Sequence, residues 1–341
     1  MTLRAIFYER IGEIIYALFE NGNIIEVRIE DKTKLYGLKI GQQYCGRVKE
    51  IDMRLSGAFI DIGIADVFLK FNGARPKYLI EGKAILVEIT RVKIAEKSAI
   101  AHYIGDARQT SICPRLIEDC ANIIADWPNP FAANAQEQNL IEILLENITS
   151  PTIGLHGGGS ICIEQTKAMC TIDVDAGGRA AGGTNQDNFN HKLNLEAAKT
   201  ICSQLILRNI GGPIVIDFVG APKQGQAREI FETMKSGLCN NLKCEILPLS
   251  KFGLCEIVRQ KKGDGLHEIM QNQTARIAID AINALAKELK IAKGKVVKLR
   301  ICTSALQVLE SWQFDWQSYL RDSVGGNYEI SQDSIERFEI T

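Results

Sequence analysis

The chain has 341 residues, of which 46% are hydrophobic and 24% are charged, and its formal net charge is −1. This composition is ordinary for a globular protein and argues against disorder, while the length predicts two or three domains with buried cores. A near-neutral total does not exclude a nucleic-acid partner, because local patches of charge set the affinity for phosphate.

The same sequence constrains targeting and cysteine chemistry. Its apolar stretches are short, and the first residues, "MTLRAIFYERIGE", place arginine and glutamate where a secretory or membrane segment needs an apolar run. We therefore expect no membrane partner. The ten cysteines are scattered in apolar runs such as "SICIEQ" and "LRICTS", which is typical of free thiols in a reducing cytoplasm. Because no C-x-x-C pair occurs, we expect no structural zinc.

The N-terminal third is predicted to be rich in short strands. Residues 3–30 alternate apolar and polar positions around "ENGN", which predicts a hairpin with an Asn-Gly turn. Short segments with glycines at the bends follow from 34 to 104 and predict a small closed or half-closed β-barrel. Aromatic and basic residues interleave on its strands: Phe59, Phe68 and Phe71 with Lys49, Arg54, Lys70 and Arg91.

These barrel residues have two interpretations. Exposed aromatic side chains stack on the bases of single-stranded nucleic acid while nearby cations follow the phosphates. Alternatively, the phenylalanines fill the core of the barrel. The spacing alone leaves both interpretations open.

Residues 105–157 carry a weaker pattern. The segments 114–127 and 136–148 predict helices, and "PNPFAANA" between them predicts a loop. From residue 158 the pattern strengthens into a glycine turn, two strands that end at "TIDVD", a helix that ends at Gly211 and Gly212, and a strand that ends at "VIDF".

The remaining chain continues the alternation of helices and strands. A helix at "GQAREIFETMKSGLCNNL" and a strand at "CEILPLS" precede the segment "FGLCEIVRQKK". Residues 264–341 predict a small α/β domain with helices over 274–290 and 304–320, a strand between them and strands near the C-terminus.

Two aspartates stand one residue apart in "CTIDVDAGG". Alternate side chains of a strand share a face, so Asp173 and Asp175 are expected to point the same way. A neighbouring "IVIDF" strand would bring Asp217 to the same place. Carboxylates crowded together repel one another and raise a pKa unless a cation is bound, and Mg²⁺ accepts such oxygen ligands. The alternative is that these aspartates cap turns.

Other motifs give weaker or negative signals. The segment "LHGGGSI" is either a phosphate cradle or, more simply, a turn into a strand. "DVDAGG" lacks the remaining ligands of an EF-hand, and no G-x-x-x-x-G-K-[ST] occurs. No serine or cysteine stands in a nucleophile motif, so covalent catalysis has no support.

Several blocks together resemble the bacterial ribonuclease E/G family. They are, in order, "GGGSICIEQTKAMCTIDVDAGG", "NLEAAKTICSQLILRNIGGPIVIDF" and "FGLCEIVRQKK", and the barrel segment "GRVKEIDMRLSGAFIDIGIADVFLKF" resembles the OB-fold domain of that family. The resemblance implies an α+β multi-domain protein with five parts. Residues 1–33 would form the N-terminal hairpin of an RNase H-like part, residues 34–104 the inserted OB-fold RNA-binding domain, and residues 105–157 a shortened RNase H-like connecting region. Residues 158–262 would form a DNase I-like catalytic domain, and residues 263–341 a small C-terminal α/β domain.

The resemblance also implies site residues. Asp173 and Asp217 match magnesium-binding aspartates of the family, with Mn²⁺ as a possible substitute. Asp175 stands where the family usually has asparagine, and it is expected to be catalytic together with them, since an aspartate can also accept a metal or orient a water. Arg259 and Lys261 match basic positions that would lie against the RNA backbone, unless they form a solvated strand end. Lys167 replaces a usual glutamate.

Two departures from the family limit what is carried over. The C-P-x-C zinc link that joins protomers is absent after "FGLCEIVRQKK", so we expect a monomer without zinc. The short segment 105–157 leaves little room for the pocket that recognises a 5′-monophosphate, so no 5′-end sensing is carried over.

The resemblance therefore predicts a cytoplasmic, Mg²⁺-dependent endoribonuclease that cleaves single-stranded RNA. An RNA-binding or ribosome-associated factor with little nuclease activity is the main alternative. A metal phosphodiesterase that acts on other nucleotides is a more distant one, which the barrel disfavours.

Overall fold

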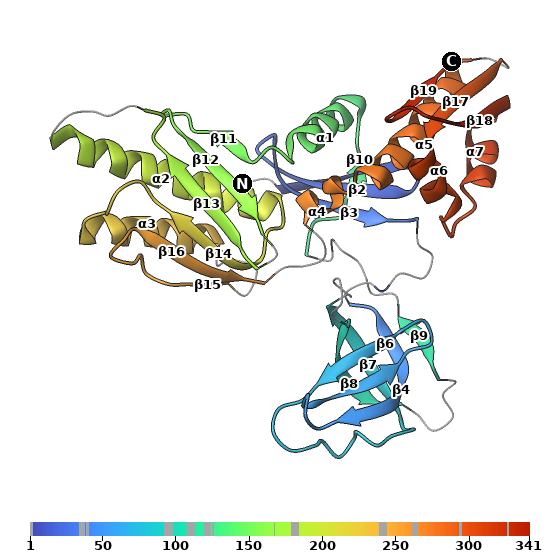
Figure 1. Cartoon of the computed structure of the whole chain (residues 1–341), viewed down its shortest axis with the longest axis horizontal. Helices are drawn as coiled ribbons and strands as arrows, with labels where there is room; N and C mark the ends of the chain where they lie inside the picture. Colours follow the sequence, from blue (N-terminus) through green and yellow to red (C-terminus); the bar gives the residue numbers. More distant parts are fainter. Residues whose placement is uncertain are drawn as a thin grey trace. The chain divides into compact units, whose positions relative to one another are not determined.

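The computed structural model describes residues 3–33, 38, 41–91, 98–107, 113–118, 124, 126–166, 168–178, 184–238, 244–260, 265–292, 295–325 and 327–341. The chain forms two compact units. The first comprises residues 1–31, 127–311 and 316–341, and the second comprises residues 32–126 and 312–315. In Figure 1 the strands β4 to β9 of the second unit form a barrel of their own.

The N-terminal sheet of the first unit is a meander rather than a single hairpin. Its order is β10-β1-β2-β3, and Asn21 and Gly22 connect β2 to β3 with φ values of 50° and 87°. These positive φ values suit an Asn-Gly turn and confirm the turn expected from "ENGN". The strands are β1 (Leu3–Arg10), β2 (Glu13–Glu20), β3 (Asn23–Asp31) and β10 (Phe131–Ala132).

Helices from later in the chain bury one face of this sheet. Ile6 and Ile15 pack with Ile141 of α1 (Ala135–Asn147) and with Leu266 of α4 (Leu266–Gln271). The segment around 136–148 is therefore helical, as its spacing predicts. Asn134 caps α1 through a reciprocal pair of hydrogen bonds with Glu137.

The central sheet of the first unit has the order β11-β12-β13-β14-β16-β15. The helices α2 and α3 cover one face of it (Figure 1), where Ile172 and Ile216 pack with Ile201 and Ile230. The elements are β11 (Thr152–Gly154), β12 (Ser160–Gln165), β13 (Cys170–Asp175), α2 (Thr184–Leu207), β14 (Gly212–Asp217), α3 (Gln224–Leu238), β15 (Cys244–Ile246) and β16 (Leu254–Arg259).

The C-terminal part pairs three strands in the order β18-β17-β19 and packs helices against them. The helix expected over 304–320 is wrong as a single element, because it is interrupted between Glu310 and Trp316, where residues 312–315 belong to the second unit. The elements are α5 (Gln273–Ile291), β17 (Val296–Cys302), α6 (Thr303–Glu310), α7 (Trp316–Val324), β18 (Asn327–Asp333) and β19 (Phe338–Ile340).

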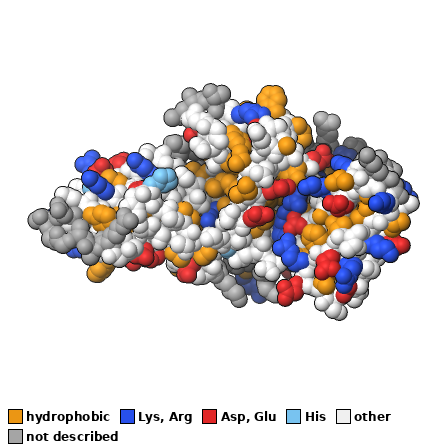
Figure 2. All heavy atoms as spheres, turned by 90° about the horizontal axis from the view of Figure 1, so that it is seen from above, with side chains coloured by type: hydrophobic (Ala, Val, Ile, Leu, Met, Phe, Trp, Pro, Cys, Tyr) orange, Lys and Arg blue, Asp and Glu red, His pale blue; other side chains and the backbone are white. Residues whose placement is uncertain are grey.

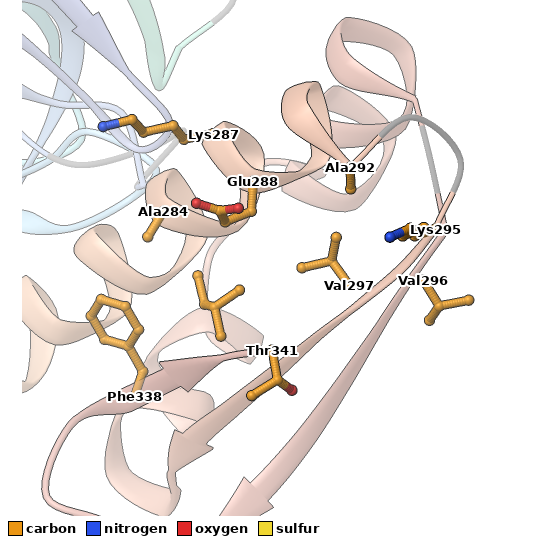
Figure 3. A pocket seen from close by; sticks show the side chains of 10 residues that line it. Ala284, Lys287, Glu288, Ala292, Lys295, Val296, Val297, Phe338 and Thr341 are labelled. Carbon is orange, nitrogen blue, oxygen red and sulfur yellow. The ribbon is translucent and has the colours of Figure 1, made fainter.

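A shallow hollow lies between α5 and the strands β17 and β19 (Figure 3). Its volume is about 600 Å³, and its lining includes Ala284, Glu288, Val297 and Phe338. No catalytic group expected from the sequence lies there.

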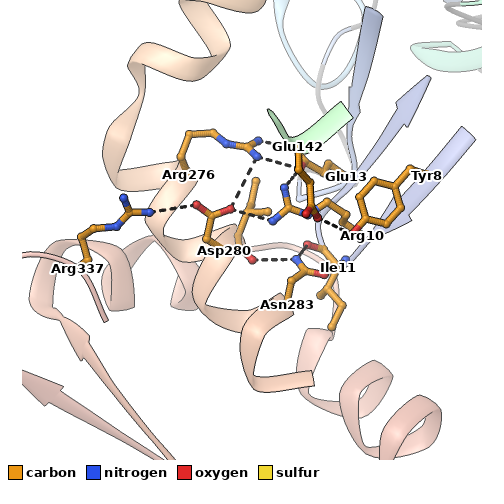
Figure 4. A network of polar contacts seen from close by, with 10 residues as sticks. Tyr8, Arg10, Ile11, Glu13, Glu142, Arg276, Asp280, Asn283 and Arg337 are labelled. Atoms are coloured by element: carbon orange, nitrogen blue, oxygen red, sulfur yellow. Dashed lines mark hydrogen bonds and ion pairs between the residues drawn. The ribbon is translucent and has the colours of Figure 1, made fainter. Parts of the chain in front are cut away.

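A buried network of charges joins the N-terminal sheet to α5 (Figure 4). Glu13, only 1% exposed, accepts hydrogen bonds from Arg276, including one of 3.0 Å, and forms an ion pair of 3.1 Å with Arg10. Arg10 also contacts Asp280 at 2.8 Å. Below this network the Asn283 side chain exchanges hydrogen bonds of 2.9 and 3.0 Å with the backbone of Ile11. Residues far apart in the sequence therefore hold each other in position.

The second unit contains a closed barrel of five strands, consistent with an OB-fold. Strands run in the order β5-β6-β8-β7-β4, and the pairing of β4 with β5 closes the cylinder. Ile60, Leu69 and Val87 fill its core. The strands are β4 (Gln43–Asp52), β5 (Gly57–Asp61), β6 (Asp66–Lys70), β7 (Ala84–Arg91) and β8 (Ile100–Asp106).

A sixth strand corrects the prediction of a helix over 114–127. β9 (Arg115–Glu118) pairs antiparallel with β4. The ladder to β4 satisfies the backbone of this segment, and such long-range pairing overrides a weak local helical pattern. Most of residues 119–125 lie outside the described part of the chain. The second unit as a whole extends to residue 126.

No helix in the described ranges is long and apolar enough to cross a membrane.

Candidate active site and RNA-binding surface

Asp173 and Asp217 lie side by side at the ends of neighbouring strands. β13 and β14 run parallel, and their register places Asp173 directly opposite Asp217. Both carboxylates are exposed, whereas the preceding residues Ile172 and Ile216 are buried under the helices. Adjacent strands are about 4.8 Å apart, so the two side chains occupy one spot on the open face of the sheet. The neighbourhood expected from "IVIDF" is confirmed.

The electrostatics of this pair favour a cation. Burial raises the pKa of Asp173, and the charges of Asp217, Asp175 and Glu164 raise it further. Within the described ranges, no basic side chain forms an ion pair with Asp173 or Asp217. A divalent ion would turn this mutual repulsion into attraction.

This repulsion predicts how a charge-removing variant behaves without metal. A raised pKa in the folded state means that the ionised form of Asp173 destabilises the fold at neutral pH. In EDTA, the free energy of unfolding of Asp173→Asn is expected to exceed that of the wild type by less than about 1 kcal/mol, because both carboxylates are exposed and screened. The variant therefore unfolds at a slightly higher temperature. Thermal unfolding at several pH values measures the difference.

The pH dependence of that difference has a defined sign. The stability difference between Asp173→Asn and the wild type reaches its full size at pH values above the raised pKa of Asp173 in the folded state. It vanishes as the pH falls below the ordinary aspartate pKa, because the wild-type carboxyl group is then neutral in both the folded and the unfolded protein. A variant that is less stable than the wild type at neutral pH in EDTA would contradict a repulsive pair.

Asp175 shares the exposed face with Asp173, since Val174 between them is buried. Its carboxylate accepts a 3.0 Å hydrogen bond from the backbone N–H of Gly177. This is the turn-capping arrangement that the sequence left open as an alternative. Asp175 therefore stabilises the turn after β13, and its charge adds to the repulsion on Asp173.

The glycine segment "LHGGGSI" forms a close-packed turn beside β13. Both carboxylate oxygens of Glu196 accept from the Gly157 N–H, at 3.1 and 3.0 Å, so this N–H already has a protein acceptor. A Cβ on Gly159 would lie 2.4 Å from the Asp175 carbonyl oxygen, which explains the glycine there. These contacts match the simpler of the two interpretations, a turn into a strand.

Asn194 opens the block "NLEAAKTICSQLILRNIGGPIVIDF", although the sequence alone assigns it no role. It lies on α2, is 1% exposed, and its amide exchanges two 3.0 Å hydrogen bonds with the backbone N–H and C=O of Val219. Val219 follows Asp217 by two residues, so Asn194 fixes the segment that leaves the carboxylate pair. A buried asparagine on the apolar face of a helix, next to Leu193 and Ala197, was the available signal.

Phe59 and Phe68 form an aromatic pair on the surface of the barrel. Their ring centroids are 5.2 Å apart in an edge-to-face arrangement, and both side chains are half-buried. Phe68 lies over Gly57, where an added Cβ would come within 1.9 Å of its ring. Phe71, in contrast, is 6% exposed and belongs to the barrel core, as the alternative interpretation holds.

The basic residues of the barrel are mostly engaged with neighbours. Lys49 pairs with Asp66 at 2.7 Å, and Arg54 pairs with Asp52 at 3.0 Å. Lys70 is exposed, and Arg91 donates to the carbonyl of Ser98 at 3.5 Å. Because most of these cations have partners, the aromatic pair is the more distinctive feature of the barrel. Across the face of the whole chain drawn in Figure 2, basic and acidic side chains are interspersed.

The aromatic pair supports a binding prediction. Replacing Phe68 with alanine is expected to weaken the affinity for short single-stranded RNA about 5- to 100-fold, since a base–aromatic stack is worth about 1–3 kcal/mol. Phe68→Tyr, which keeps the ring, is expected to bind like the wild type. Fluorescence anisotropy with labelled RNA in EDTA measures the affinity.

The control for this prediction is Leu55→Ala, which removes an exposed apolar side chain from the same barrel. Equal affinities for the Phe68→Ala and Leu55→Ala proteins would show that Phe68 does not stack on RNA.

The expectation that Arg259 contacts RNA needs correction. Arg259 is 5% exposed and donates a 2.6 Å hydrogen bond to the Ile210 carbonyl, because its side chain shares the buried face of β16 with Cys255 and Ile257. This alternation of faces was available from the sequence. Lys261 and Lys167 lie outside the described residues.

In the described part of the chain, no three or more His, Cys, Asp or Glu side chains gather into a metal-binding group. The Asp173–Asp217 pair is thus a two-carboxylate arrangement. Mg²⁺ is commonly held by one or two carboxylates while water and substrate phosphate complete its shell, so the donor set suits that ion.

Taken together, the fold and the site define an α+β protein that combines an OB-like barrel with a carboxylate pair at parallel strand ends. Comparison with known proteins agrees: residues 76–262 match the model of the ribonuclease E/G family. The chain belongs to the ribonuclease E/G family, as the sequence blocks indicate.

Individual relatives cover shorter parts of the chain. It is 30% identical over 164 residues to ribonuclease G of Salmonella typhimurium, covering 46% of this chain and 33% of the relative. It is 37% identical over 123 residues to a chloroplastic ribonuclease E/G-like protein of Arabidopsis thaliana, a match that covers 36% of this chain and 12% of the relative. It is 32% identical over 130 residues to ribonuclease E of Nostoc sp., a match that covers 38% of this chain and 19% of the relative. The chain thus spans a third or less of the length of these relatives.

Proposed function

We propose that this protein is a divalent-metal-dependent endoribonuclease that binds single-stranded RNA on its barrel and hydrolyses it at Asp173 and Asp217. The observation that carries the proposal is the register of β13 and β14, which sets these two exposed carboxylates side by side without a described basic partner. Membership of a family whose curated members are named ribonucleases supports the same conclusion.

The proposed cation is Mg²⁺, with Mn²⁺ as a possible replacement. Asp173 and Asp217 would hold it. When bound, such an ion neutralises charge on a phosphodiester and lowers the pKa of a water molecule. Zinc is not part of the proposal, and neither is the zinc-linked dimerisation of the family.

The surrounding residues have roles of their own in this proposal. Asp175 adds negative charge beside the Asp173–Asp217 pair. This charge strengthens the attraction of the pair for a cation and increases its repulsion of the RNA phosphate. Asn194 holds the segment after Asp217 and so keeps the second carboxylate in register with the first. The chain offers no nucleophilic side chain in a known motif, so hydrolysis by water is the proposed chemistry.

The barrel supplies the RNA-binding part of the proposal. Phe59 and Phe68 would stack on unpaired bases, which selects single strands because paired bases are already stacked. Lys70, exposed on the same barrel, would contact phosphate. The DNase I-like assignment of the sheet that carries Asp173, the RNase H-like assignment of the N-terminal sheet, the monomeric state and a cytoplasmic location belong to the same proposal.

The direct test is cleavage of an internally labelled single-stranded RNA, compared with the same sequence in a duplex. With Mg²⁺ we expect internal cuts in the single strand only, and with EDTA we expect none. If the protein binds this RNA tightly but leaves it intact with Mg²⁺ and with Mn²⁺, the nuclease proposal fails and an RNA-binding factor takes its place.

A further inference from the structure

One aromatic side chain near the carboxylate pair has no role in the function proposed so far. Phe252, in the turn between β15 and β16, is 83% exposed and is the most exposed large hydrophobic residue in the described part of the chain. Phenylalanine is normally buried because its exposure costs free energy. Single exposed apolar side chains are common on protein surfaces, so it is the position of this ring beside the carboxylate pair that makes it a candidate contact for a ligand.

The turn that carries Phe252 is held in one conformation by its own backbone. The Ser250 hydroxyl accepts from the N–H of Phe252 at 3.3 Å and from that of Leu254 at 3.2 Å. The Ser250 and Leu254 backbones also pair at 2.9 Å, and the Gly253 N–H donates to the Ser250 carbonyl at 3.1 Å. The ring is thus presented on a preorganised support, which lowers the entropic cost of binding.

This turn is pressed against the segment that follows Asp217. Gly253 has a φ of 88°, and a Cβ there would lie 2.6 Å from the Gly220 carbonyl oxygen and 3.5 Å from that of Phe218. A side chain at position 253 would push the two segments apart. The glycine permits their close approach, so the position of Phe252 is tied to that of Asp217.

The strand register places the turn that carries Phe252 close to Asp217. Leu254 pairs directly with Asp217 across β16 and β14. Phe252 precedes Leu254 by two residues within a turn, so their Cα atoms are at most about 7 Å apart, the length of two residues of extended chain. One nucleotide of an extended strand covers a similar length. The exposed Lys251 is the immediate neighbour of the ring.

We propose that Phe252 and Lys251 form a nucleotide subsite beside the carboxylate pair. The Phe252 ring stacks on one unpaired base adjacent to the scissile phosphodiester, and the Lys251 ammonium group contacts a neighbouring phosphate. This inference rests on the proposed ribonuclease function and adds to it a residue that positions the RNA strand beside the carboxylate pair. Aromatic stacking tolerates all bases, so the subsite positions the strand without strict sequence choice.

RNA fits this surface better than a protein partner does. The ring stands next to a lysine and next to carboxylates that would hold a cation, which is the charge pattern that a nucleotide with its phosphate requires. A protein contact made by the same turn is the competing explanation, and cleavage of RNAs that lack single bases distinguishes the two.

The test uses the full chain and one short single-stranded RNA made in several versions, each lacking the base at a different position around the cut. With Mg²⁺, wild-type kcat/KM is expected to fall about 5- to 100-fold when the base that stacks on Phe252 is missing. Phe252→Ala is expected to show the same loss on the complete RNA and no further loss at that position, whereas Phe252→Trp retains the wild-type pattern.

The matched control is Phe131→Ala, because Phe131 is also an exposed phenylalanine, 63% accessible, but lies on β10 of another sheet. This variant is expected to cleave every RNA like the wild type. Two results would overturn the inference while leaving the ribonuclease function intact. In the first, Phe252→Ala cleaves every RNA like the wild type, and in the second, its activity falls by the same factor on every version. Unchanged cleavage together with altered self-association in sedimentation would assign the ring to a protein contact instead.

Failure of the ribonuclease proposal is distinguishable from failure of the subsite. If the wild type cleaves none of the RNAs, the same set is compared by affinity in EDTA. A loss of affinity confined to one missing base in the wild type, and absent in Phe252→Ala, supports the subsite. Equal affinities for all versions reject it.

Discussion

Replacing Asp173 or Asp217 with asparagine is expected to reduce the rate of RNA cleavage by at least about 10³-fold. Each variant removes one of the two carboxylates proposed to hold the cation, and electrostatic stabilisation of the transition state often contributes more to catalysis than any other single effect. Single-turnover cleavage of labelled single-stranded RNA measures the rate. RNA affinity in EDTA is expected to stay at the wild-type level, since the barrel residues are unchanged.

Metal binding gives a second readout that does not depend on activity. At a concentration of 100 times Kd, a bound ion adds about 2.7 kcal/mol to the stability of the wild type, and neither variant should show this gain. The matched control is Glu329→Gln, an exposed strand carboxylate on the C-terminal sheet. Full cleavage by Asp173→Asn or Asp217→Asn would refute the assignment of the site.

Removing the Glu13 carboxylate is expected to cost about 3–5 kcal/mol of folding stability, because it leaves the buried Arg276 with only the more distant Asp280, 4.0 Å away, as an acidic partner. Glu13 is 1% exposed and Arg276 is 8% exposed, so water reaches neither group freely. Arg10 loses an ion pair at the same time. The free energy of unfolding of Glu13→Ala, from urea titration, measures the effect.

A double replacement and a surface pair complete this comparison. Glu13→Leu combined with Arg276→Met is expected to recover most of the lost stability, since no charge is then buried alone. Asp66→Ala breaks the exposed Lys49–Asp66 pair of the barrel and should change stability far less than Glu13→Ala does. Equal costs for Glu13→Ala and Asp66→Ala would mean that the buried network contributes no more than a surface bridge.

Local signals in the sequence predicted the elements that depend on local structure. The Asn-Gly turn needs only two residues with positive φ, and α3 and α5 follow from apolar residues at helical spacing along their own length. The pairing of Asp173 with Asp217 was also accessible, since both end short apolar strands on either side of one helix, the usual plan of a parallel βαβ unit.

The features that the sequence did not predict depend on distant partners. β9 is a strand because β4 offers it a ladder, although its own pattern favours a helix. The burial of Arg259 is the exception, because its alternation with Cys255 and Ile257 along β16 is a local pattern that outweighs its resemblance to an RNA-contacting position. Asn194 carries no chemistry in isolation, and its importance appears only when its hydrogen bonds to Val219 are seen.

The packing of the N-terminal meander has a consequence for the order of events during synthesis. Its core includes Ile15 from the second strand and Leu266 from α4, so the sheet emerges from the ribosome long before its covering residues exist. At about 5–20 residues per second, the roughly 250 residues between them take on the order of 10–50 s to translate. Ile141 of α1 is translated earlier than Leu266, so during that interval the apolar face of β1 to β3 has only part of its native cover. The barrel, whose strands lie close together in the chain, is free to fold first.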